Sequence, residues 1–327
     1  MGAGVSSAVL SLWRDEASRR GLEGFDWETS PGATTTSLKL FVAQAETLAR
    51  HCGQRSLGWR LGERYDFRLL GEVGNAILAC STLGAALRRF SDFFALLQDA
   101  SELSLSFEKR HCTVSYRILD PEIWPRHQNA IFTLALVAQL IRKAAPSHWE
   151  EAEVFVEEPD PAAARQLALA SGVSCFPGAE ANILRFPLHL LELALPAEPN
   201  LIVPDLPGMN LCLVQKRREA DTGELVRAMI YQRLGSGQIA QGTIARAIGV
   251  SSRTLRRRLA DEGTCFQQIV DDCRMRQAAH EFRKRRPISI AQTALRLGYA
   301  EHSTFTRAFT RWSGMAPQAF IAARQLV

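Results

Sequence analysis

The chain has 327 residues, a length typical of two domains rather than one. Apolar residues make up 46% of it and charged residues 22%, a balance that excludes a collagen-like, low-complexity or wholly disordered protein. The longest apolar stretch, 130–141, is shorter than a membrane span and is followed by two basic residues. We therefore expect it to be a buried helix, and we expect no membrane-spanning segment and no secretory signal.

The seven cysteines predict neither a disulfide framework nor a zinc site. Their number is odd, and no two of them form a C-x-x-C pair. The sequence also lacks a glycine-rich phosphate loop, a G-x-S-x-G motif and a metal-spaced set of histidines and glutamates. We therefore expect free thiols in a reducing cytoplasm, no metal site, no cofactor and no enzymatic activity.

Charge is divided unevenly along the chain. The net formal charge is +5. The segment 215–327 holds 20 Lys and Arg against 9 Asp and Glu, a net charge of +11, and the remaining 19 basic and 25 acidic residues leave 1–214 at −6. The basic residues of the last third are arginines except for Lys216 and Lys284. The arginine fork matches phosphates and the guanine edge, so this region either binds a polyanion or presents a solvated basic surface, and charge alone does not separate the two.

Hydrophobic periodicity in the first two thirds predicts helices followed by strands. Apolar residues at helical spacing predict helices over 6–20 and 36–52, and Thr82 is placed to cap a further helix with Phe90 and Phe94 on its buried face. Apolar and polar residues then alternate over 103–107 and 112–118, on either side of the polar segment 108–111, which predicts a β-hairpin. The next expected elements are a helix over 122–144, a strand over 151–157, a helix from Pro161 and a strand over 182–186. Together they predict an α+β domain over 1–195.

Proline is concentrated after this domain. The four prolines are Pro196, Pro199, Pro204 and Pro207. Their density favours a semi-rigid linker over a continuous helix. We therefore place a linker at 196–209 and a second domain at 210–327.

The second domain contains a pattern typical of a helix-turn-helix motif, over about 237–260. Gly249 favours a turn with positive φ, and Ser251 or Ser252 can cap the helix that follows. In that helix Leu255 and Leu259 are four residues apart and face inward. The residues that share its opposite face are Arg253, Arg256 and Arg257.

The same plan returns over about 287–312. Ala294 and Gly298 repeat the spacing of Ala245 and Gly249, with a small residue where two helices cross and a glycine at the turn. The outward residues of the second helix are His302, Ser303, Thr306 and Arg307. A helix predicted over 266–284 joins the motifs, so we expect an all-α domain with two helix-turn-helix motifs and a linker helix. The basic run 283–286 is either a phosphate contact or a solvated loop.

Two segments carry a resemblance to a known family. Residues 295–299 read Leu-Arg-Leu-Gly-Tyr, and Phe305-x-Arg-Ala-Phe-x-x-Trp-x-Gly-x-x-Pro follows; Ser252-Arg-Thr-Leu-x-Arg-x-Leu with Glu262-Gly263 supports them. The region resembles the DNA-binding domain of AraC/XylS-family transcription regulators. Thr293 departs from the pattern, because the family usually has an aliphatic residue there. The stretches 57–62 and 69–87, with the hairpin, resemble the effector domain of the ornithine-utilisation-regulator branch.

The resemblance implies a sequence-specific DNA-binding transcription regulator. It implies an activator controlled by an unidentified small-molecule effector, acting as a homodimer in the cytoplasm, with double-stranded promoter DNA and RNA polymerase as partners. It also implies which residues lie in the major groove: Arg253, Arg256, Arg257, His302, Ser303, Thr306 and Arg307. Two alternatives stay open, an enzyme that carries such a domain, with a thiol such as Cys175 as nucleophile, and an architectural protein with no effector.

Overall fold

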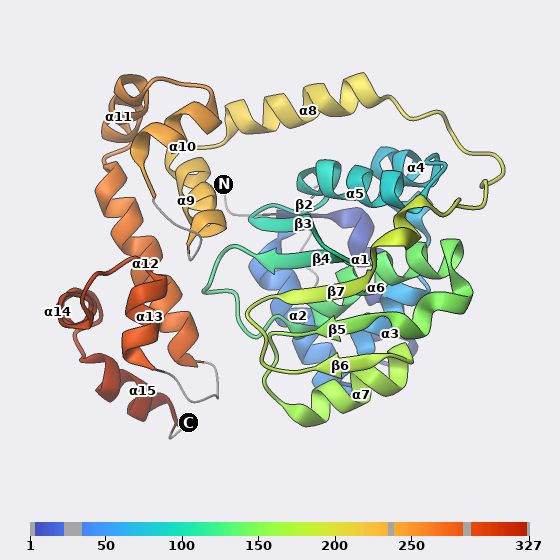
Figure 1. Ribbon diagram of the computed structural model, residues 1–327, viewed down its shortest axis with the longest axis horizontal. Coiled ribbons are helices and arrows are strands. Elements are labelled where there is room, and N and C mark those ends of the chain that lie inside the picture. Colours follow the sequence, from blue (N-terminus) through green and yellow to red (C-terminus); the bar gives the residue numbers. More distant parts are fainter. Residues whose placement is uncertain (1–3, 23–34, 235–238, 284–288, 326–327) are drawn as a thin grey trace. The chain divides into compact units, whose positions relative to one another are not determined.

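The computed structural model describes residues 4–22, 35–234, 239–283 and 289–325 (Figure 1). The chain forms two compact units, one from 1–118 and 123–215 and the other from 119–122 and 216–327. The division falls inside helix α8 (Leu206–Glu219), which begins within the predicted linker. Pro207 is compatible with that helix because it occupies the second helical position, where a backbone N–H has no helical acceptor.

The first unit contains seven further helices and three short 3-10 turns in its described part. The helices lie along the chain with a long hairpin between the fifth and the sixth (Figure 1). They are α1 (Ser7–Arg19), α2 (Leu38–His51), α3 (Leu57–Glu63), α4 (Glu72–Leu78), α5 (Leu83–Leu97), α6 (His127–Ala144) and α7 (Pro161–Ser171). The turns are η1 (Phe67–Leu70), η2 (Pro146–Glu151) and η3 (Leu188–Glu192).

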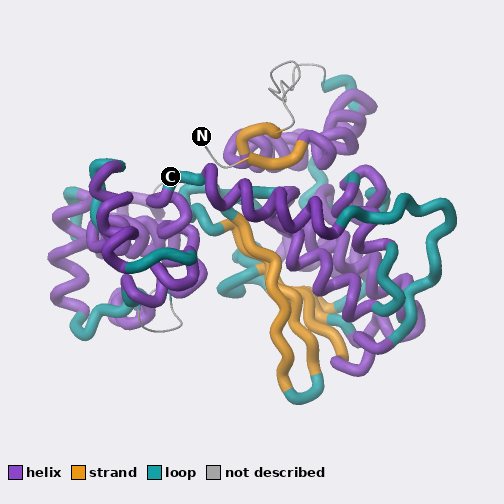
Figure 2. The backbone as a smooth tube through the Cα atoms, turned by 90° about the horizontal axis from the view of Figure 1, so that it is seen from above, coloured by secondary structure: helices purple, strands orange, loops and turns teal. Residues whose placement is uncertain are grey.

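The larger of the two sheets in this unit has five strands (Figure 2). Its strands lie in the order β3-β4-β7-β5-β6, antiparallel except for the pair β5–β6. Leu103 pairs with Tyr116 and Leu105 with Val114, so these side chains share the face on which α5 and α6 pack. The strands are β3 (Ser101–Glu108), β4 (His111–Ile118), β5 (Glu153–Phe155), β6 (Ser174–Phe176) and β7 (Asn182–Pro187), beside a separate pair, β1 (Gly4–Ser6) and β2 (Thr35–Ser37).

The hairpin, the cap at Thr82 and the helix from Pro161 are confirmed. The Thr82 hydroxyl accepts a hydrogen bond from the Ala85 amide at 3.2 Å, and α7 begins at Pro161. The helix predicted over 122–144 begins only at His127, because Pro125 restricts the residue before it to extended backbone. The helices predicted over 6–20 and 36–52 begin one to two residues later in the structure, because the short strands β1 and β2 occupy their first residues.

Helix α3 was missed, and its glycines explain both the omission and the packing. Gly58 and Gly62 weaken a helical pattern in the sequence. In the structure a side chain at Gly58 would lie 2.1 Å from the Gln128 carbonyl oxygen, and one at Gly62 would lie 2.6 Å from that of Phe132. Both glycines therefore let α3 lie directly against the backbone of α6.

The second unit is all helical in its described part. Its elements are α9 (Thr222–Arg233), α10 (Gln241–Ile248), α11 (Ser252–Asp261), α12 (Phe266–Arg283), α13 (Ile290–Arg296), α14 (His302–Ser313) and α15 (Pro317–Gln325). The fold class predicted from the sequence, an α+β domain and an all-α domain with two helix-turn-helix motifs, is confirmed. The first residues expected in each motif, at 237 and 287, and the basic run after Arg283 lie outside the described residues.

Candidate nucleic-acid interface

The first helix-turn-helix is built from α10 and α11. Gly249 ends α10 with a φ of 80°, a conformation that favours glycine. The Ser251 hydroxyl then accepts a hydrogen bond from the Thr254 amide at 3.1 Å and caps α11. Leu255 and Leu259 are fully buried, so the position of α11 in the unit is fixed by its inner face.

The outer face of α11 is strongly basic. Arg253, Arg256 and Arg257 are exposed, as the spacing predicted. Within the described residues, no acidic side chain forms an ion pair with any of the three. Their guanidinium groups are therefore available to an external anion.

The second helix-turn-helix, α13 and α14, repeats this construction. Ala294 is fully buried between the helices, and Gly298 makes the turn with a φ of 83°. Phe305 and Phe309 are fully buried on the inner face of α14. The structure thus gives both motifs the small residue, the glycine and the inward pair that the sequence predicted.

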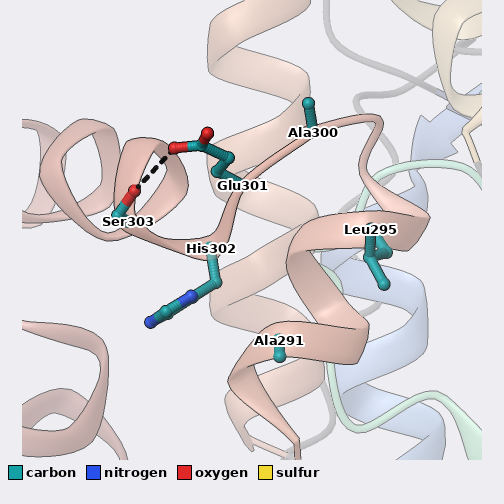
Figure 3. Close-up of a pocket in the computed structure, with 6 residues that line it drawn as sticks. All are labelled: Ala291, Leu295, Ala300, Glu301, His302 and Ser303. Atoms are coloured by element: carbon teal, nitrogen blue, oxygen red, sulfur yellow. Dashed lines mark hydrogen bonds between the residues drawn. The ribbon is translucent and has the colours of Figure 1, made fainter.

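Four predicted residues share the outer side of α14, but they differ in what they can offer. His302, Ser303 and Arg307 are exposed, whereas Thr306 is half-buried. The Thr306 hydroxyl donates to the His302 carbonyl oxygen at 2.9 Å, so it is engaged within its own helix. The Ser303 hydroxyl donates to a carboxylate oxygen of Glu301 at 3.2 Å (Figure 3). Glu301 was not among the residues predicted for this interface.

An open hollow of about 430 Å³ lies beside the start of α14 (Figure 3). Ala291 and Leu295 of α13 form its apolar side, and Leu295 is 64% exposed. The segment Ala300–Ser303 forms the other side. The N-terminal end of this helix is therefore accessible from outside.

One helix holds both motifs. The first half of α12 contributes Ile269, Val270 and Cys273 to the core around α10 and α11. Its second half contributes Ala278 and Phe282 to the core around α13 and α14. Because a single continuous helix is packed into both cores, the two outer faces are held in a fixed relation within the unit.

Comparison with known proteins identifies the family. Residues 29–195, just over half of the chain, match the model described as the arabinose-binding N-terminal domain of AraC transcription regulator, and residues 244–323 match a helix-turn-helix domain. The chain belongs to the AraC family of transcription regulators.

Its relatives are HTH-type transcriptional regulators, as expected. An uncharacterized one from Mycobacterium tuberculosis is 27% identical over 303 residues, covering 89% of this chain and 85% of its own. The ornithine utilization regulator of Pseudomonas aeruginosa is 28% identical over 279 residues, covering 82% and 79%. The regulator VirS of Mycobacterium tuberculosis is 34% identical over 104 residues, covering 32% and 30%.

Two contacts that stabilise the DNA-binding domain of this AraC-family regulator were not predicted from the sequence. Glu262 ends α11, and its two carboxylate oxygens accept hydrogen bonds from the Thr222 and Gly223 amides at 2.8 Å, which caps α9. Arg274 on α12 packs against Tyr299 in the turn of the second motif. Both involve residues of the family pattern, but their partners lie far away in sequence.

None of the cysteines with a shifted pKa has an activated thiol. Burial raises the pKa of Cys112 and of Cys273 to about 12, and burial also raises the pKa of Cys175. A nucleophilic thiol requires the opposite shift. The described residues include no cluster of three potential metal ligands and no helix that is long and apolar enough to span a membrane.

Proposed function

We propose that this AraC-family regulator binds promoter DNA by placing α11 and α14 in consecutive major grooves. Their outer faces carry the seven predicted contact residues, Arg253, Arg256, Arg257, His302, Ser303, Thr306 and Arg307. Recognition helices of this motif contact base edges through their N-terminal residues, and consecutive grooves are about 34 Å apart. Arginine reads guanine through two hydrogen bonds, and serine and threonine bond to bases or phosphates.

The observation that carries this proposal is the shared packing of α12. Ile269 and Phe282 lie at opposite ends of this helix and in different cores. A flexible tether would allow each motif to bind alone, whereas a continuous helix fixes their spacing. Where that spacing departs from the groove repeat, the DNA must bend, at a cost that depends on its sequence.

We further propose that the first unit binds a small-molecule effector and pairs two copies of the chain. Binding would shift the protein between DNA-competent and incompetent arrangements, which requires different effector affinities for the two. Support comes from the match of 29–195 to an effector-domain family. In this proposal the regulator is an activator that recruits RNA polymerase in the cytoplasm, the compartment of bacterial DNA.

Footprinting on the DNA upstream of the gene and its neighbours tests the proposal. We expect protection of two adjacent major-groove turns on one face, altered by metabolites that the neighbouring genes handle. The double variant Arg257→Ala/Arg307→Ala should lose most of this protection. A matched control, Arg60→Ala/Arg165→Ala, removes two exposed arginines from the first unit and should bind as the wild type does. Equal protection by both double variants would contradict the assigned interface.

A further inference from the structure

An acidic residue stands at the start of the second recognition helix. Glu301 is the N-cap residue of α14, with extended backbone, and its side chain makes no capping hydrogen bond. The helices α11 and α13 instead begin with Ser251 and Ser289, each of which accepts a hydrogen bond from a backbone amide of its own helix. Serine is a preferred N-cap residue, and glutamate is not. The glutamate therefore contributes no capping hydrogen bond to its helix.

The Glu301 carboxylate is exposed and oriented by its neighbour. One oxygen accepts a hydrogen bond from the Ser303 hydroxyl at 3.2 Å (Figure 3). Within the described part of the chain, no basic side chain forms an ion pair with it. Glu301 also lines the hollow, together with Ala291 and Leu295, whose side chains are apolar. Because Glu301 is exposed, its carboxylate is accessible from outside the protein.

A negative charge at this place opposes simple phosphate binding. The N-terminus of a helix attracts phosphates through its amide groups and its dipole. Arg307, exposed on the same helix, and the basic face of α11 attract the DNA backbone through their positive charge. A carboxylate repels phosphates, so Glu301 weakens sequence-independent binding at the point where α14 would enter the groove. A ligand group that pairs with this carboxylate must be a hydrogen-bond donor.

The major groove offers few donors. Guanine presents two acceptors, and thymine presents an acceptor and a methyl group. Adenine presents an amino donor beside the N7 acceptor, a pair that suits the amide of asparagine or glutamine. A carboxylate fits adenine poorly, because the N7 acceptor repels the carboxylate oxygen that faces it. Cytosine presents the N4 amino donor, which carboxylates accept.

We propose that Glu301 selects cytosine at one position of the operator by accepting a hydrogen bond from its N4 amino group. Ser303 acts as a positioning residue that holds the carboxylate toward the groove. The proposal rests on the proposed function, since it requires α14 in the major groove. A base without a donor at this position would leave the carboxylate desolvated and unpaired.

Selection from a random duplex library with the full-length chain tests this inference. Wild-type protein should enrich cytosine at one position of the half-site read by α14. Glu301→Gln should change the preferred base at that position to adenine, by about 5- to 100-fold over cytosine. Glu301→Ala should remove the preference there and raise affinity for non-specific duplex. The matched control is Glu224→Gln, the same change at an exposed acid in the first turn of α9, and should reproduce the wild-type motif.

Ser303 has a separate readout. Ser303→Ala should lower the preference for cytosine without creating a preference for adenine. Ser303→Thr, which keeps a hydroxyl, should retain the wild-type preference for cytosine. A purely structural role would instead lower binding to all sequences alike.

Three outcomes would overturn the inference. If both Glu301 variants keep the wild-type motif while Arg307→Ala changes it, Glu301 reads no base and the proposed function stands. If the Glu301 variants change only transcription with purified RNA polymerase, the residue contacts protein instead. If the wild-type chain enriches no motif, the proposed function fails and this inference fails with it.

Discussion

The guanidinium carbon of Arg274 lies 5.1 Å from the centre of the Tyr299 ring, over its face. The contact joins the middle of α12 to the turn of the second helix-turn-helix. Gly298 precedes the tyrosine with a φ of 83°, and a side chain there would come within 3.0 Å of an Arg274 nitrogen. The turn is therefore formed around this arginine, and the contact helps fix α14 relative to α12.

Replacing Arg274 by alanine should destabilise the second motif. Loss of a cation–π contact and of the packing of the arginine stem should lower the free energy of unfolding by about 1–2 kcal/mol. Operator selectivity should fall as well, because the outer face of α14 becomes less well fixed. Urea denaturation and equilibrium binding measure the two effects. Tyr299→Phe, which keeps the ring, is the control; a loss as large as that of Arg274→Ala would contradict the ring contact.

Thr293 makes a second prediction for the same motif. It is 1% exposed, and its hydroxyl finds no hydrogen-bond partner in the described residues. A buried polar group without a partner is costly, whereas valine has nearly the same shape. We expect Thr293→Val to raise the free energy of unfolding by about 1 kcal/mol in urea denaturation. Thr293→Ser, which keeps the hydroxyl and removes the methyl, should lower it.

The helix-turn-helix region was predictable because its signals are local. The positive φ of Gly249 and Gly298, and the burial of Leu255 and Phe305, follow from spacing within about ten residues. Missed features depend on distant partners. Glu262 caps a helix 40 residues upstream, and the fit of α3 against α6 depends on glycines that by themselves weaken a helix.

The candidate site was predicted less completely than the fold. Helical spacing identified outward residues on α11 and α14, but spacing does not show which hydroxyl is engaged, as in Thr306. Glu301 was not predicted because it precedes the helix, and its charge is opposite to that expected of a residue that contacts DNA. Its position becomes informative only when its carboxylate is seen beside Ser303 and not on the helix amides.

A buried ion pair links the start of α6 to the sheet. Two nitrogens of Arg126 donate to the two carboxylate oxygens of Glu157 at 2.8 Å, and a third donates to the Ile118 carbonyl oxygen at 2.7 Å. Asn182 donates to the same carboxylate at 2.9 Å. The two charged side chains are 6% and 3% exposed.

Removing one partner of this pair should cost more than removing both. Arg126→Met leaves the Glu157 charge buried without its main partner, and it should lower the free energy of unfolding by about 3–5 kcal/mol. The double variant Arg126→Met/Glu157→Leu should recover part of this loss, because no uncompensated charge remains. Denaturation of the full chain measures both. A double variant less stable than Arg126→Met would show that the pair contributes mainly through its other hydrogen bonds.

Glu46 of α2 and His127 at the start of α6 should affect stability in opposite directions with pH. A Glu46 carboxylate oxygen accepts a hydrogen bond from the Gln128 amide at 2.6 Å, and burial raises the pKa of Glu46 from 4.5 to about 7. Burial lowers the pKa of the adjacent His127 from 6.5 to about 4. Between pH 4.5 and 7 the folded chain binds a proton at Glu46 that the unfolded chain lacks, so this contribution to stability falls as pH rises. Between pH 4 and 6.5 the unfolded chain binds a proton at His127 that the folded chain lacks, so this contribution falls as pH falls.

The two contributions should nearly cancel from pH 4.5 to 6.5, where each changes by about 1.4 kcal/mol per pH unit. Glu46→Gln should therefore lose stability relative to the wild type as pH falls through this range. His127→Gln should lose stability relative to the wild type as pH rises through it. Urea denaturation at half-unit steps from pH 4.5 to 7.5 measures the differences. The double variant Glu46→Gln/His127→Gln is the control and should follow the wild-type pH profile from pH 4.5 to 6.5. Parallel profiles for the two single variants over this range would show that the groups do not titrate as their burial requires.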